Sequence, residues 1–131
     1  IFDPITHEVK AILDWELSTL GNPIADFTYH MMSWRLPAGA KGLGMMGSDL
    51  KSLNIPSESE YAELYYKKTG REKIDNWDFY MAYNIFRLAG IAQGIVGRVR
   101  DGTASSSEAK NYEAFVPILG KLGWSIVEGI K

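Results

Sequence analysis

A long apolar helix limits the folds that this chain of 131 residues can adopt. From residue 77 to about residue 100, large nonpolar side chains fall on nearly every side of a helix, and such a helix is buried among its neighbours. Gly90, Gly94 and Gly97 would give it a smooth face that another helix can approach closely. The sequence therefore predicts a central helix, and its apolar residues are Phe79, Tyr80, Met81, Tyr83, Ile85, Phe86, Leu88, Ile91, Ile95, Val96 and Val99.

Start signals mark three further helices. Pro23 suits the first position of a helix, where its missing N–H costs nothing, and apolar residues follow it at helical spacing. The Ser-x-x-Glu patterns at residues 57–60 and 105–108 are capping boxes that open a second and a terminal helix. Pro117 lies inside the terminal helix and predicts a kink or break near residue 115.

The N-terminal residues have a different pattern. Short apolar runs at residues 1–2 and 9–13 flank a segment with Asp-Pro turn chemistry, which predicts a β-hairpin with a loop of several residues. We therefore expect a mainly α fold, in which a short N-terminal β-hairpin precedes four to five helices. The length fits one domain, residues 1–131.

The composition excludes several classes of partner. The net charge of −2 provides no large basic surface for nucleic acid or an anionic membrane. The absence of cysteine rules out disulfides and cysteine-based zinc sites and favours a reducing compartment. No uncharged apolar run approaches the roughly 18 to 20 residues of a membrane-spanning helix. We expect a soluble, cytoplasmic chain with no nucleic-acid or membrane partner.

A glycine-rich segment, residues 36–54, contains the pattern G-x-G-x-x-G at residues 42–47. A phosphate-binding loop of this type follows a strand and opens a helix, whereas here a helix and Pro37 come first. The pattern therefore favours a flexible connector. Trp34 and the methionines nearby are candidates for the lining of a substrate entrance.

Three acidic residues are candidates for phosphate chemistry. The apolar run 11–13 ends at Asp14, Glu16 follows two residues on, and Asp26 falls in the first turn of the helix that Pro23 starts. A carboxylate at a strand end is held in place by the strand and can bind a divalent cation, which prefers hard oxygen ligands. The alternative from spacing alone is that Asp14 is a turn residue and Asp26 complements the helix dipole.

Polar residues also interrupt the apolar helix, namely Asn84, Arg87 and Gln93. A buried Arg needs an anionic partner because its desolvation is costly. One interpretation is an internal pair of Arg87 with Asp14, Glu16 or Asp78. The other is that Arg87 faces a cleft and holds an anionic group of a substrate.

The amino-acid sequence around these acidic residues resembles that of a known family. Ile12-Leu13-Asp14-Trp15-Glu16 followed by Gly21-Asn22-Pro23-Ile24-Ala25-Asp26 resembles the aminoglycoside phosphotransferase-like kinases. More narrowly, it looks like the kinase-like domain fused to some acyl-CoA dehydrogenases. Further matches to that subgroup are Ile55-Pro56-Ser57, Thr69-Gly70-Arg71, Asn76-Trp77-Asp78-Phe79-Tyr80, Phe86-Arg87-Leu88-Ala89 and Asp101-Gly102-Thr103-Ala104-Ser105.

The resemblance implies a protein-kinase-like C-terminal lobe and an ATP-dependent phosphotransferase that acts on a hydroxyl group of a small molecule, aminoglycoside-like or hydroxyacyl-type. By resemblance, Asp14 would hold the Mg²⁺ that bridges the ATP phosphates, and Glu16 would assist the metal or contact substrate. Asp26 would brace the catalytic loop. Trp34, Arg87 and Gln93 are the candidate acceptor-binding residues.

In the resembling kinases, the nucleotide-binding lobe and the catalytic loop precede the residues that match Ile1 onward. We therefore expect residues 1–131 to be a C-terminal part of a kinase-like domain that lacks both. Such a part would be inactive, would bind Mg·ATP poorly, and would expose apolar surface that favours self-association.

Two other classes of function remain open. The first is a catalytically dead kinase-like module that binds a ligand or partner, and the catalytic loop of the longer protein would discriminate it. The second is a helical interaction domain without a nucleotide site, in which Asp14 and Asp26 are merely exposed or capping.

Overall fold

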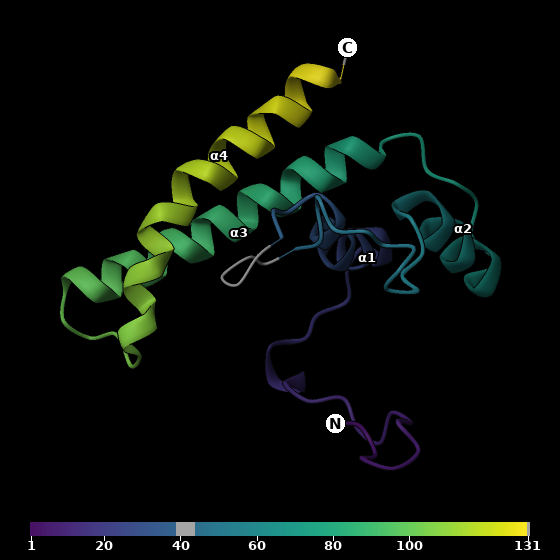
Figure 1. The fold of residues 1–131 in the computed structure, drawn as a ribbon, viewed down its shortest axis with the longest axis horizontal. Coiled ribbons are helices and arrows are strands. Elements are labelled where there is room, and N and C mark those ends of the chain that lie inside the picture. Colours follow the sequence, from purple (N-terminus) through teal and green to yellow (C-terminus); the bar gives the residue numbers. More distant parts are fainter. Residues whose placement is uncertain (39–43, 131) are drawn as a thin grey trace.

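The computed structural model describes residues 1–38 and 44–130, and the fold is mainly helical, as the sequence predicts (Figure 1). Its described elements are η1 Trp15–Leu17, α1 Pro23–Met31, η2 Met32–Trp34, α2 Glu58–Thr69, α3 Trp77–Arg100, η3 Ser107–Asn111 and α4 Tyr112–Gly129. The described residues contain isolated β-bridges rather than strands. The predicted count of four to five helices is confirmed by four α-helices in the described ranges.

Helices α3 and α4 form an antiparallel hairpin that carries much of the core (Figure 1). Met81 and Ile85 of α3 and Leu119 of α4 are almost completely buried in it. A Cβ atom built on Gly123 would lie 3.4 Å from Cγ2 of Ile85, an ordinary van der Waals distance, so α3 and α4 are in contact at this position. The central position of α3 is therefore confirmed for this side of the helix.

Helix α1 packs across α3 through a buried polar contact. The fully buried Asn84 donates from Nδ2 to the carbonyl oxygen of Ala25 at 2.9 Å and to Oγ1 of Thr28 at 2.8 Å. Thr28 Oγ1 in turn donates to the carbonyl oxygen of Ile24 at 2.7 Å. A buried amide must be paired, so this network fixes which face of α1 meets α3. At the start of α1, Pro23 is the first residue, as predicted, and Asn22 is the N-cap.

Helix α2 opens with the predicted capping box. Ser57 Oγ accepts the backbone N–H of Glu60, and the Glu60 carboxylate accepts the N–H of Ser57 at 2.8 Å. Gly70 ends the helix in the left-handed conformation, with φ of 67°. Aromatic stacking joins α2 to α1, because the rings of Phe27 and Tyr65 lie 3.8 Å apart.

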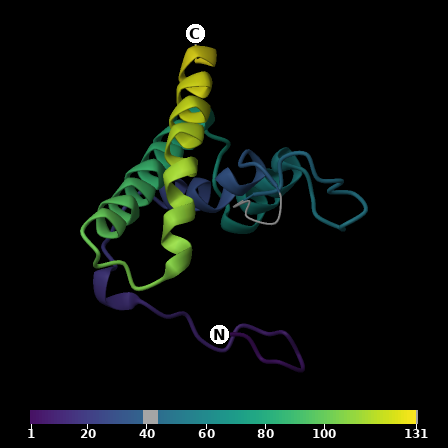
Figure 2. The same ribbon diagram turned by 60° about the vertical axis from the view of Figure 1, so that its left-hand side comes forward.

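The N-terminal segment, residues 1–20, extends away from the helices (Figures 1 and 2). The predicted hairpin is reduced to one antiparallel bridge between Phe2 and Val9. Asp3 closes its turn by accepting the N–H groups of Ile5 and Thr6, which lowers the pKa of the Asp3 carboxyl. Residues 10–14 form no strand, so Asp14 does not lie at a strand end.

Two predictions for α3 are wrong over the described residues. The helix is not buried on every side, since Phe79 and Phe86 are 58% and 75% exposed. No described atom lies within 4 Å of a Cβ built on Gly90, Gly94 or Gly97, so no described helix packs closely there. The apolar pattern correctly finds the helix, but the part of the chain that the structure describes covers only some of its faces.

Two local predictions in other elements also change. Ser106, rather than Ser105, caps the terminal helical segment, and its Oγ accepts the N–H of Glu108 at 3.2 Å. Helix α4 runs continuously through Pro117, so of the predicted kink or break only the break is wrong. Of the G-x-G-x-x-G pattern, Gly42 and Leu43 lie outside the described residues. Gly44 lies so close to Leu36 that a Cβ atom on residue 44 would clash with the Leu36 carbonyl oxygen, which explains the need for glycine there.

Candidate functional site

Asp14 lies in the extended N-terminal segment, immediately before η1. Its backbone is left-handed, with φ of 62° and ψ of 43°, a conformation that costs an L-residue of this type about 1 kcal/mol. Trp15 fixes the turn by donating from Nε1 to the carbonyl oxygen of Ile12 at 2.7 Å. The Asp14 side chain caps nothing and is exposed, so its carboxylate is free to bind a cation.

Glu16 lies two residues further, in η1, and is also exposed. Among the described residues, neither Asp14 nor Glu16 accepts a hydrogen bond or joins an ion pair, and no group of three acidic or histidine side chains converges on one point. The described part of the chain thus offers two free carboxylates, which can supply part of a Mg²⁺ coordination shell. Mg²⁺ commonly binds through one or two carboxylates together with substrate phosphates and water.

Asp26 is exposed in the first turn of α1, where a carboxylate interacts favourably with the helix dipole. The turn of α1 that contains Asp26 is held against α3, because the carbonyl oxygen of the adjacent Ala25 accepts a hydrogen bond from the buried Asn84 amide. The predicted supporting role of Asp26 toward a catalytic loop remains a prediction.

Arg87 differs from the buried arginine that the sequence suggests, because it is exposed. Its Nη1 donates to Oδ1 of Asn84 at 3.2 Å, and its guanidinium lies 5.0 Å from the ring centre of Tyr29 and 5.8 Å from that of Tyr83. The predicted internal pairing with Asp14, Glu16 or Asp78 is wrong for the described residues. An amide and two aromatic rings therefore orient the Arg87 side chain while its charge stays available for an anion.

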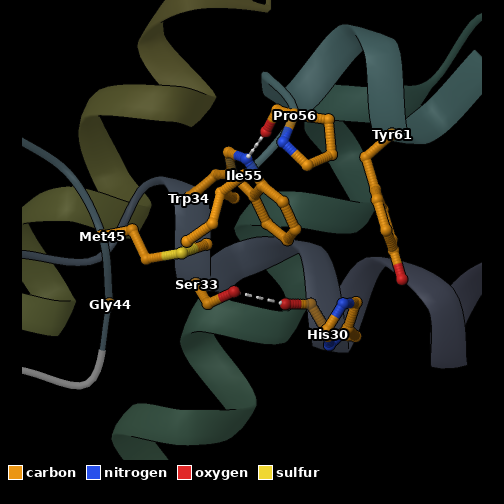
Figure 3. A pocket seen from close by; sticks show the side chains of 8 residues that line it. All are labelled: His30, Ser33, Trp34, Gly44, Met45, Ile55, Pro56 and Tyr61. Atoms are coloured by element: carbon orange, nitrogen blue, oxygen red, sulfur yellow. Dashed lines mark hydrogen bonds between the residues drawn. The ribbon is translucent and has the colours of Figure 1, made fainter. Parts of the chain in front are cut away.

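Trp34 lines a separate, open pocket of about 550 Å³ between η2 and the start of α2 (Figure 3). Its Nε1 donates to the carbonyl oxygen of Pro56 at 2.9 Å, which fixes the indole. The rings of His30 and Tyr61 lie 5.6 and 5.1 Å from the indole ring, and Met45 completes the apolar wall. The methionine side chain expected near Trp34 is thus present. Gln93 is exposed on α3 and does not line this pocket.

Arg35, which no sequence pattern singles out, joins more charged partners than any other described arginine. Its guanidinium contacts Glu58 at 2.7 Å and Asp78 at 2.6 Å, and Trp77 donates from Nε1 to the same Glu58 carboxylate at 2.7 Å. The hydrogen-bonded Glu58 raises the pKa of Arg35. The sequence pattern suggests that Glu58 is one of several solvent-facing charged residues of α2. In the structure, its carboxylate contacts Arg35 and Trp77 and so joins η2, α2 and α3. The aromatic residue beside each of Arg35 and Asp78 is the signal that indicates a partly buried network.

The predicted site residues therefore fall into separate places. Asp14 and Glu16 lie in the N-terminal segment, Asp26 and Arg87 belong to the packed pair α1 and α3, and Trp34 lines its own pocket. Within the described chain, Asn84 is the residue that connects the α1 turn containing Asp26 with Arg87.

The sequence matches a known family over its N-terminal half. A sequence model of the phosphotransferase enzyme family matches residues 1–64, the range that contains Asp14, Glu16 and Asp26. Together with the mainly helical fold, this match confirms the resemblance to phosphotransferase-like kinases. The part of the chain that is similar to the phosphotransferase enzyme family is therefore residues 1–64.

Curated relatives extend the similarity over nearly the whole chain. Acyl-CoA dehydrogenase family member 10 of Mus musculus is 42% identical over 125 residues, which is 95% of this chain and 12% of that protein. Family member 11 of Homo sapiens is 34% identical over 94% of this chain and 16% of its own length. A probable acyl-CoA dehydrogenase, IBR3 of Arabidopsis thaliana, is 33% identical over 82% of this chain and 14% of its own.

The chain thus spans 12–16% of the length of these relatives. No solved structure matches it. Among the described residues, no helix is long and apolar enough to cross a membrane.

Proposed function

We propose that residues 1–131 form the metal- and acceptor-binding part of an ATP-dependent phosphotransferase that phosphorylates a hydroxyl group of a small molecule. The observation that carries this proposal is Asp14, a free carboxylate held in a left-handed backbone conformation inside the matched range 1–64. Phosphoryl transfer depends mainly on positioning and on charge stabilisation, so a fixed carboxylate that holds Mg²⁺ is a central requirement. ATP and Mg²⁺ are the cofactors that this chemistry needs.

The other residues take roles that agree with their surroundings. Glu16 assists the metal or contacts substrate, and Asp26 supports the catalytic loop of a larger kinase-like domain. Arg87, oriented by Asn84 and two tyrosine rings, binds an anionic group of the acceptor. Trp34 and Gln93 are further acceptor contacts, and they lie outside the cluster that Arg87 forms with Asn84 and the two tyrosine rings. A cytoplasmic location fits a reaction that consumes ATP.

The proposal places residues 1–131 in the C-terminal lobe of a longer protein, and it is supported by the small share of each relative that the chain covers. In the resembling kinases the nucleotide lobe and catalytic loop belong to another part of the domain. Residues 1–131 by themselves are then inactive and bind Mg·ATP weakly.

The test is an ATP-consumption assay on a longer polypeptide that contains residues 1–131, with hydroxyacyl-CoAs and aminoglycosides as acceptors. Asp14→Asn should reduce turnover by about a hundredfold or more, because a bound metal contributes several kcal/mol of charge stabilisation. Asp75→Asn, which changes an exposed carboxylate just before α3, is the matched control and should keep wild-type turnover. Absence of turnover with every acceptor, together with absence of Mg·ATP binding, would instead support the catalytically dead kinase-like module.

A further inference from the structure

The side-chain amide of Asn84 can take only one of its two orientations in the contact between α1 and α3. The carbonyl oxygen of Ala25, 2.9 Å from Nδ2, can only accept a hydrogen bond. Oγ1 of Thr28, 2.8 Å from Nδ2, directs its own proton at main-chain carbonyl oxygens of α1, the nearer being that of Ile24 at 2.7 Å. Thr28 therefore accepts from Asn84, so Nδ2 faces α1 and Oδ1 faces Arg87.

The opposite orientation of the amide would be costly. It would place Oδ1 of Asn84 against the carbonyl oxygen of Ala25 and Nδ2 against the guanidinium of Arg87, so that acceptor meets acceptor and donor meets donor. Both Thr28 and Asn84 are completely buried, and a buried polar group without a partner is destabilising. The hydroxyl of Thr28 thus helps to determine on which side of Asn84 the acceptor oxygen lies.

Arg87 receives this acceptor oxygen. Its Nη1 lies 3.2 Å from Oδ1 of Asn84, and the ring centres of Tyr29 and Tyr83 lie 5.0 and 5.8 Å from its guanidinium. Among the described residues, no carboxylate forms an ion pair with Arg87, and its side chain is exposed. A guanidinium offers several further N–H donors. Arg87 is therefore held in place while these donors stay available, which lowers the ordering cost of binding a ligand.

We propose that Thr28 and Asn84 are positioning residues that hold Arg87 for an oxyanion, a phosphate or a carboxylate group, of a ligand. The planar fork of arginine donors matches two oxygens of such a group. Thr28 and Asn84 are buried and do not touch the anion, since Thr28 orients Asn84 and Asn84 orients Arg87. The assignment of the anion to the acceptor of a phosphotransferase rests on the proposed function, whereas the orientation of Arg87 does not.

The test is a titration of the 131-residue chain with inorganic phosphate and, separately, with acetate, followed by heteronuclear NMR at constant ionic strength. The samples contain no nucleotide, metal ion or acceptor. The signal followed is the Nε–H group of Arg87, assigned by its absence in Arg87→Lys. In the wild type at least one of the two anions should shift this signal in a saturable manner. A response to phosphate alone assigns a phosphoryl group of the ligand, and a response to acetate alone assigns a carboxylate.

Thr28→Val keeps the shape of the side chain and removes the hydroxyl. It should weaken the binding of the anion by about threefold or more, because one neutral hydrogen bond changes an equilibrium constant by about that factor. Thr28→Ser, which restores the hydroxyl, should restore the affinity. Thr69→Val is the matched control, because Thr69 Oγ1 donates to the carbonyl oxygen of Tyr65 at 2.8 Å, four residues before it, on the exposed end of α2. This control should bind the anion like the wild type.

A second measurement uses the wild type alone, so it does not depend on the folding of Thr28→Val. The NMR order parameter of the Nε–H group should be higher for Arg87 than for Arg71, an exposed arginine in the segment after α2. Equal order parameters would contradict the orientation of Arg87 by Asn84.

Three results of the titration would overturn the proposal. They are the absence of a saturable shift with either anion, equal affinity of the wild type and Thr28→Val, and loss of the response in a longer polypeptide, where another part of that polypeptide would then occupy Arg87. Oxyanion binding at Arg87 that depends on the Thr28 hydroxyl, in a longer polypeptide without turnover, would instead support this inference and count against the proposed function.

Discussion

At the scale of single residues, Asn84 is a fully buried polar side chain that makes hydrogen bonds to both α1 and Arg87. It is completely buried, donates twice to α1 and accepts from Arg87, so it supports both the α1 turn containing Asp26 and the orientation of Arg87. Sequence analysis identifies Asn84 as an unusual polar residue in an apolar helix, but it does not reveal which groups the amide meets.

We expect Asn84→Ala to lower the free energy of unfolding by about 2 kcal/mol, because it removes two buried hydrogen bonds to α1 and leaves a cavity in place of the amide. The measurement is urea unfolding followed by circular dichroism at the helix band. Gln93→Ala, which removes an exposed amide from the same helix, is the matched control and should change stability by less than about 0.5 kcal/mol. Equal effects of the two substitutions would show that the Asn84 contacts contribute nothing.

The two ion pairs of Arg35 should differ in strength because their carboxylates differ in exposure. The Glu58 side chain is 25% exposed and also accepts from Trp77, whereas the Asp78 side chain is 51% exposed. Double-mutant cycles with Arg35→Met should give a coupling of about 1–3 kcal/mol with Glu58→Gln and less than about 1 kcal/mol with Asp78→Asn. A larger coupling to Asp78 than to Glu58 would contradict the assignment of Glu58 as the anchor.

At the scale of elements, the N-terminus of α2 makes stability depend on pH. Ser57 donates to the Glu60 carboxylate from both Oγ and N, which lowers the pKa of Glu60 in the folded state. A lowered folded-state pKa adds stability above the unfolded value of about 4.3, and that stability is lost as pH falls through the folded value.

The urea midpoints of the wild type and Glu60→Gln should therefore differ at pH 7 and converge as the pH approaches 3. Glu63→Gln, an exposed carboxylate of the same helix outside the capping box, is the control and should have a midpoint near that of the wild type at pH 7. A Glu60→Gln difference that stays constant from pH 7 to 3 would exclude a contribution from the carboxylate charge.

Local sequence signals predict these elements well, because each signal acts within one turn of chain. Pro23 and the Ser57 capping box correctly place helix starts. Contacts between residues far apart in the sequence cannot be predicted from local patterns, because they depend on how the helices cross. The sequence therefore suggests Arg87 as the partner of a carboxylate, whereas in the structure Arg35 pairs with Glu58 and Asp78. The same limit applies to α3, whose apolar pattern is equally consistent with burial on every side and with an exposed groove.

At the scale of the whole molecule, the described chain exposes apolar side chains in two places. One is the N-terminal segment, where Phe2, Leu13 and Trp15 are more than 60% exposed. The other is an apolar groove between α3 and α4, bordered by the exposed rings of Phe86 and Trp124. Both surfaces contain apolar side chains that favour burial by about 25 cal/mol for each Å² removed from water. The chain spans at most 16% of the relatives given above, so its surroundings in a longer protein bear directly on these surfaces.

We propose that Asp14 holds the metal ion of a phosphotransferase. The most direct measurement is binding of Mn²⁺, as a spectroscopic substitute for Mg²⁺, to a longer polypeptide containing residues 1–131 in the presence of ATP, followed by the loss of the free Mn²⁺ paramagnetic resonance signal. Asp14→Asn keeps the size of the side chain and tolerates the left-handed backbone, so it tests the charge alone. We expect the wild type and Asp75→Asn to bind Mn·ATP, and Asp14→Asn to bind it at least about tenfold more weakly, a loss of about 1.4 kcal/mol. Equal Mn·ATP affinity in the wild type and Asp14→Asn would exclude Asp14 as the metal ligand.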